Sequence, residues 1–196
     1  NEEAVEKKDY SAAWIAKYSS TGELEWTQSL EGGDNSFTAL KISAAAVDQQ
    51  GHLHLAGEFG KTANLGTIRH QTNLLDADDE RSIPIYEKGT FLVHLNTKGG
   101  VIRATKIGTN DLSVKALKID AKGAALIAGN YRGTDNAPDL GSPTTPIPML
   151  GSLQLKDAGN GQGAFIANLN TAHKPIWAQA FTSYNSIKLN SLAIHN

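Results

Sequence analysis

Three stretches of the chain align without gaps: AWIAKYSSTGELEWTQSL (13–30), TFLVHLNTKGGVIRATKI (90–107) and AFIANLNTAHKPIWAQAF (164–181). An aromatic residue lies at the second position of each, and apolar and polar residues then alternate on both sides of a short turn. Alternation with a period of two around a tight turn is typical of a β-hairpin. The sequence therefore predicts three hairpins of one kind.

A second kind of unit follows the first two hairpins. It reads KISAAAVDQQGHLHLAGEF at 41–59 and VKALKIDAKGAALIAGNY at 114–131, and KLNSLAIHN at 188–196 aligns with its beginning. Both full copies contain Asp-x-x-Gly between two apolar strands. The Asp side chain accepts hydrogen bonds from nearby backbone N–H groups, and glycine adopts positive φ. Structural turns are therefore predicted at these residues: Asp48, Gly51, Asp120 and Gly123.

Two hairpins make four antiparallel strands, which is the composition of a β-propeller blade. We therefore predict an all-β fold of about two and a half blades. A polar extension (1–12) precedes blade repeat 1 with a long connector (13–89), blade repeat 2 with a long connector (90–163) and a partial blade repeat 3 (164–196). So few blades form only an incomplete ring. Three interpretations are considered: a piece of a longer chain, an open stack capped by the connectors, or an oligomer that completes the ring. The first is favoured, so we expect the chain to be part of a larger protein or assembly.

Composition excludes several classes of protein. The net charge is −2, so the chain lacks the basic field that attracts nucleic acid. No apolar stretch approaches the roughly 18 residues of a membrane-spanning helix. There are no cysteines, which excludes disulfides and a thiolate nucleophile. No hydrolase, phosphate-binding or dinucleotide-binding motif occurs, so we expect no enzyme activity and no cofactor other than a calcium ion.

The pattern of these residues resembles the bacterial β-propeller repeat family called SBBP, found on surface and exported proteins of Bacteroidetes. The residues that carry the resemblance are Trp14, Ile15, Lys17, Gly22, Trp26, Asp48, Gly51, Gly57, Phe91, Asn96, Gly99, Asp120, Gly123 and Gly129. The chain departs from the pattern at Arg103, where tryptophan is expected, and at His173, where a turn glycine is expected. The resemblance implies a secreted protein or lipoprotein at the bacterial outer surface.

Two groups of side chains are candidates for metal binding. His52 and His54 lie two apart in a predicted strand and so share a face, with His70 as a conceivable third zinc ligand. The alternative is a polar strand face next to a turn, because no carboxylate partner is evident and the second copy is apolar at 124–127. The acidic cluster Asp76, Asp78, Asp79 and Glu80 offers oxygen ligands for calcium, or forms a solvated loop.

Trp14, Trp26, Trp177, Tyr18 and Tyr184 could stack on sugars, but the tryptophans lie at blade-equivalent positions, which favours packing between blades. Ligand binding is instead expected in the connectors, 60–89 and 132–163, because insertions on a rigid repeat scaffold carry function. The candidate ligand-binding residues there are Asp76, Asp78, Asp79, Glu80 and Tyr86. The expected role is a non-enzymatic binding or scaffold module for a surface protein or glycan. The alternatives are a hydrolase or lyase acting on extracellular glycans, and a structural subunit of a surface complex.

Overall fold

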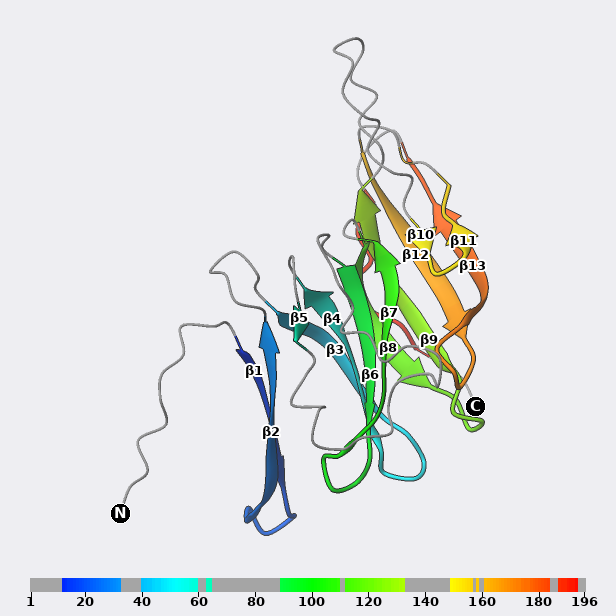
Figure 1. Ribbon diagram of the computed structural model, residues 1–196. Coiled ribbons are helices and arrows are strands. Elements are labelled where there is room, and N and C mark those ends of the chain that lie inside the picture. The colour runs from blue at the N-terminus through cyan, green and yellow to red at the C-terminus, as the bar shows by residue number, and fades with distance from the viewer. Residues whose placement is uncertain are drawn as a thin grey trace.

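The structure is a computed structural model that describes residues 12–32, 40–59, 63–64, 89–109, 112–132, 149–156, 158, 161–183 and 187–193. Within these residues the fold is all-β and antiparallel, as predicted, with no helix. The described strands form three sheets, which lie side by side in Figure 1 and do not close into a ring.

We name the sheets by their order in the chain. The first sheet contains β1 (Ala12–Tyr18), β2 (Leu24–Gly32) and β5 (Ala63–Asn64). The middle sheet contains β3 (Lys41–Val47), β4 (Leu53–Phe59), β6 (Gly89–Leu95), β7 (Val101–Thr109), β10 (Met149–Leu150) and β11 (Leu153–Gln154). The last sheet contains β8 (Leu112–Ile119), β9 (Ala125–Arg132), β12 (Gln162–Leu169) and β13 (Pro175–Phe181).

The strands combine into sheets differently from the expected segmentation, which joined the hairpin 13–30 to the unit 41–59. Instead, β4 pairs along its whole length with β6, and β9 pairs with β12. Each four-stranded set therefore takes its first two strands from one aligned unit and its last two from the next. The strand orders β3-β4-β6-β7 and β8-β9-β12-β13 are equivalent, and β3 and β8 are bulged at the same place.

Two apolar clusters hold the sheets against one another. The first interface lies between the first sheet and the middle sheet, where Leu30 of β2 packs against Phe91 and Val93 of β6. The second interface lies between the middle sheet and the last sheet, where Leu92 of β6 packs in one cluster with Val114 of β8 and residues of β9 and β12. Because neighbouring residues of a strand point to opposite faces, the middle sheet is covered on both sides.

The predicted turn chemistry is confirmed at both Asp-x-x-Gly sites. Oδ1 of Asp48 accepts hydrogen bonds from the backbone N–H groups of Gln50 (2.9 Å) and His52 (2.8 Å). Oδ1 of Asp120 accepts equivalent bonds, both 2.8 Å long. Gly51 and Gly123 have φ of 79° and 81°, in the left-handed region that glycine reaches without a steric penalty.

The aromatic residues are less buried than their recurrence suggested. Trp14 is 69% exposed, although the equivalent residues Phe91 and Phe165 are fully buried. Phe91 is covered by the first sheet, whereas no described sheet lies on the outer face of the first sheet. Tyr18 and Trp177 are exposed for the same reason, at the two ends of the stack. The prediction that these three residues form a core is therefore wrong for this part of the chain.

Other expectations fall outside the described residues. Asp76, Asp78, Asp79, Glu80, Tyr86 and His70 all lie there, as does most of the polar extension. No helix among the described residues is long and apolar enough to cross a membrane.

Candidate metal centre

Four histidines gather where the middle sheet meets the last sheet. His54 of β4 and His94 of β6 lie directly opposite each other in the strand pairing, and their rings stack with centroids 4.0 Å apart. Both residues share the face of Ala56 and Leu92, which pack in the second interface. The face is apolar at one end and becomes polar toward the turn that carries His52.

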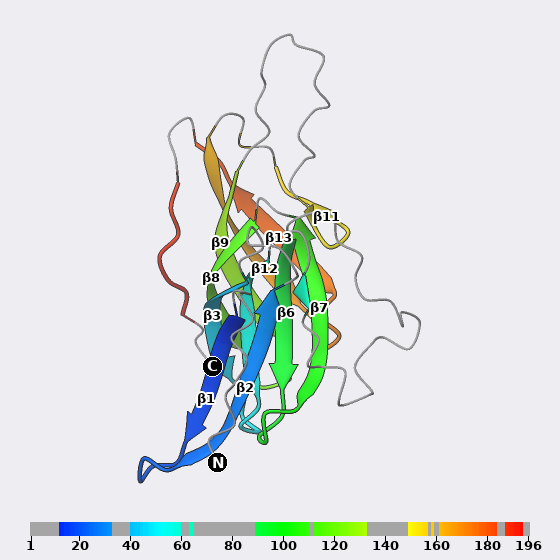
Figure 2. The same ribbon diagram turned by 60° about the vertical axis from the view of Figure 1, so that its left-hand side comes forward.

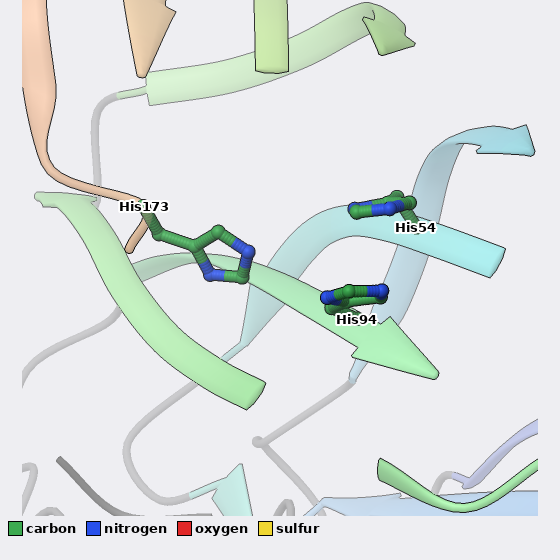
Figure 3. A group of neighbouring side chains, drawn as sticks. All are labelled: His54, His94 and His173. Atoms are coloured by element: carbon green, nitrogen blue, oxygen red, sulfur yellow. The ribbon is translucent and has the colours of Figure 1, made fainter. Parts of the chain in front are cut away.

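The fourth histidine comes from the last sheet. His173 lies in the turn between β12 and β13, with φ of 61°, and is the single described residue other than glycine with positive φ. Its Nδ1 lies 3.1 Å from the hydroxyl oxygen of Thr105 on β7, and the side chain is buried. Figure 3 shows its ring directed toward the stacked pair of His54 and His94. Figure 2 shows the β12 and β13 hairpin behind β6 and β7.

Asp48 connects the turn to the histidines. While its Oδ1 closes the turn, its Oδ2 lies 3.2 Å from Nε2 of His54, 3.3 Å from Nδ1 of His52 and 3.9 Å from Nε2 of His94. The expectation that His52 and His54 have no carboxylate partner is therefore wrong. It overlooked that the side chain of a turn aspartate has a second oxygen, which points onto the adjoining strand.

The environment keeps the buried histidines neutral and the aspartate ionised. Burial lowers the pKa of His173 to about 3, helped by the nearby Arg103. Burial also lowers the pKa of His94 to about 4, helped by the neighbouring His54 and His52. Burial also lowers the pKa of His54, against the opposing effect of Asp48. Burial tends to raise the pKa of Asp48, but hydrogen bonds from the backbone of His52, the ring of His54 and the backbone of Gln50 bring it below 3.8.

Two of the buried ring nitrogens have no hydrogen-bond partner: Nδ1 of His54 and Nε2 of His94. An unpaired polar atom in the interior costs free energy, so such atoms are rare without a function or a bound species. Two sets of three residues each bring one ligand atom per residue within 4.8 Å of one another: His54, His94 and His173, and Asp48, His52 and His94. Each set therefore brings together three nitrogen or oxygen atoms of the kinds that bind metal ions.

The first interface has a tryptophan and a glycine at the positions that Arg103 and His173 occupy in the second interface. There the side chain of Trp26 covers Gly99, and its Nε1 donates a hydrogen bond of 3.0 Å to the carbonyl oxygen of Thr97. A Cβ on Gly99 would lie 2.8 Å from Cε3 of the indole. In the second interface Arg103 takes the position of Trp26, and His173 takes that of Gly99. The imidazole is accommodated because no indole covers the turn.

Sequence reasoning found part of this site. It singled out His52, His54, Arg103 and His173 separately, but it did not bring them together and did not notice His94. The usable signal was the alignment itself, in which His94 stands where the other hairpins have Lys17 and Asn168. All five residues depart from their aligned counterparts, and the fold brings them to one place.

No family model matches the chain, and no curated protein matches it significantly.

Proposed function

We propose that the chain is a non-enzymatic scaffold and binding module, built of propeller-type blades that stack face to face and present their connectors to a partner. One observation supports this most directly. The two end faces of the stack expose apolar side chains at positions that are buried or partly buried wherever a neighbouring sheet is present. The proposal keeps the resemblance to SBBP repeats, and with it a location at a bacterial surface.

The outer face of the first sheet exposes Trp14 and Tyr18, which are 69% and 60% exposed. The equivalent residues of the middle sheet are Phe91 and Leu95, both fully buried against the first sheet. Exposed apolar side chains that adjoin on one surface favour association. A further sheet of the same kind would cover Trp14 and Tyr18 as the first sheet covers Phe91 and Leu95.

The outer face of the last sheet exposes Trp177 and Phe181, which are 44% and 47% exposed. Trp177 aligns with Trp26, which binds the turn of the next sheet, and Phe181 aligns with Leu30, which is buried in the first interface. The two end faces are therefore the two halves of one kind of interface. Such halves on one molecule associate head to tail.

The ligand of the module is expected on the connectors. Asp76, Asp78, Asp79, Glu80 and Tyr86 belong to the acidic connector 60–89, which suits recognition of a protein or glycan, with calcium as a conceivable ligand. Binding rather than catalysis is proposed because the residues shared by aligned segments are explained by strands and turns. We expect the purified chain to bind such a partner without turning it over.

Sedimentation velocity over a concentration series tests the stacking. The unmodified chain is expected to form open-ended oligomers that grow with concentration. Trp14→Ser with Tyr18→Ser blocks one end face, and Trp177→Ser with Phe181→Ser blocks the other. Each double variant alone should be monomeric, and an equimolar mixture should form dimers and nothing larger, because one intact interface remains per pair.

Thr21→Ser with Glu23→Ser is the matched control, since it changes two exposed positions in the turn between β1 and β2 and none on the face that carries Trp14 and Tyr18. This control should associate like the unmodified chain. A chain that stays monomeric at all concentrations, or a mixture that forms no dimer, would contradict the stacking proposal.

A further inference from the structure

We propose that the second interface binds one divalent transition-metal ion of the zinc class through His54, His94 and His173. Two of these residues come from the middle sheet and one from the last sheet, so the ion would link the two sheets. The inference is independent of the proposed scaffold function, because it depends on a different part of the molecule.

The chemistry of the ligand atoms defines the class of metal. Three imidazole nitrogens suit zinc, copper, nickel and iron, whereas calcium and magnesium take oxygen ligands. All three residues are largely buried, with His54 2% and His173 4% exposed. Metal ions bind the neutral form of imidazole, and burial between the two sheets favours that form.

Two of the three ligands, His54 and His173, are already oriented by a hydrogen bond from their other ring nitrogen to a second residue. Nε2 of His54 is bound to Asp48, which leaves the unpaired Nδ1 for the metal. Nδ1 of His173 is bound to Thr105, which leaves Nε2. A carboxylate or hydroxyl on the far nitrogen fixes the tautomer and raises the basicity of a metal-binding histidine. Asp48 also supplies a negative charge that offsets the ion and the nearby Arg103.

The spacing fits a small ion. Three atoms that lie within 4.8 Å of one another have a common centre at most about 2.8 Å from each, compared with about 2.0–2.1 Å for a Zn–N bond. A movement of less than about 1 Å per ring brings the three nitrogens to the Zn–N distance. The rings of His54 and His94, which stack with their planes 16° apart, must also tilt toward each other so that both nitrogens face the ion. A tetrahedral zinc ion takes four ligands, so a solvent molecule would supply the fourth.

The aligned segments argue against a purely structural reason for these histidines. The positions of His54, His94 and His173 hold Leu126, Asn168 and Gly99 in aligned segments of the same chain. The fold therefore forms without histidine at each position. His173 in addition adopts a backbone conformation that glycine takes without cost.

The test is a titration of the full chain, stripped with EDTA, with Zn²⁺ by calorimetry and with Co²⁺ by visible absorption. We expect one ion per chain and the intense visible bands of four-coordinate Co²⁺. At a free Zn²⁺ concentration 100 times the Kd, the melting temperature should rise by about 5–10 °C. Asp48→Asn should weaken binding by about 10–100-fold.

His173→Gly, which introduces the residue of the aligned turns, should fold and lose both the Co²⁺ bands and the Zn²⁺-dependent rise in melting temperature. His94→Asn should do the same and serves as the second variant. His52→Ala is the matched control and should bind Zn²⁺ with unchanged stoichiometry. Absence of stoichiometric binding by the unmodified chain would overturn the proposal. Loss of binding in His52→Ala with retention in His173→Gly would also overturn it, because the ion would then lie at Asp48, His52 and His94.

Discussion

Exchanging the Arg103–His173 pair for the tryptophan–glycine pair of the first interface should reveal a strong energetic coupling between the two positions. In the first interface Trp26 contacts Gly99, where an added Cβ would approach the indole to 2.8 Å. A tryptophan introduced by Arg103→Trp would meet the imidazole of His173 in the same place. Overpacking of this kind costs about 1–3 kcal/mol of folding free energy.

His173→Gly alone has opposing effects that nearly cancel. It removes a backbone strain of about 1–2 kcal/mol, because φ of His173 is 61°. It also removes a buried ring and its contact with Thr105, worth about 1 kcal/mol, and adds the entropic cost of glycine. The net change should be smaller than about 1.5 kcal/mol.

The double variant should recover what Arg103→Trp loses. With glycine at 173 the indole can cover the turn and donate to the carbonyl oxygen of Thr171, as Trp26 donates to Thr97, for about 0.5–1.5 kcal/mol. We therefore expect it to be more stable than the sum of the single changes by at least about 1.5 kcal/mol. Urea unfolding in EDTA, followed by far-ultraviolet circular dichroism, measures all four proteins. Additivity within about 0.5 kcal/mol would refute the equivalence of the two interfaces.

Three further outcomes are expected. Gly57→Ala should lower the free energy of unfolding, measured with urea, by more than about 3 kcal/mol, because the new Cβ would lie 2.0 Å from the carbonyl oxygen of Lys41. A much smaller decrease would contradict the close approach of β3 and β4. Gly51→Val should cost about 1–3 kcal/mol, since φ there is 79°, and an unchanged melting temperature would contradict the turn. Without metal, the free energy of unfolding should fall by at least about 2 kcal/mol as the pH is lowered from 6.5 to 4. The pKa values of His94 and His173 are about 4 and about 3 in the folded chain, below the value of 6.5 in the unfolded chain, so the unfolded chain binds more protons over this range. Urea midpoints that do not change with pH across this range would contradict the prediction.

Local chemistry was predictable from the sequence. The Asp-x-x-Gly turns depend on a side-chain oxygen and a glycine within four residues, so Asp48 with Gly51 and Asp120 with Gly123 could be identified without any tertiary information. The hairpins followed from alternation of apolar and polar residues around a short turn. Both signals act over distances that the sequence displays directly.

The combination of hairpins into sheets was not predictable in the same way. A short connection favours pairing between consecutive strands. Only residues 33–40 separate β2 from β3, so the sequence placed these two strands in the same blade. In the structure β4 pairs instead with β6, across a connector of more than twenty residues. An alternating series of hairpins can be divided into four-stranded sets in two ways, and the alignment alone does not distinguish them.

The candidate site was only partly predictable for a similar reason. His54 lies 40 residues from His94 and 119 from His173 along the chain. Their proximity depends on the pairing of β4 with β6 and on the packing of the last sheet against the middle one. The sequence did contain an indirect signal, since the departures from the aligned pattern coincide with the residues that the fold assembles.

Diffraction from a crystal grown with Zn²⁺, with anomalous data collected at the zinc absorption edge, would show whether residues that depart from the aligned pattern hold a metal between two stacked sheets. We expect one strong anomalous peak bonded to His54, His94 and His173, with β4 paired to β6 beside it. A crystal without such a peak, a peak bonded to other residues, or a middle sheet in which β4 and β6 are separate would contradict this expectation.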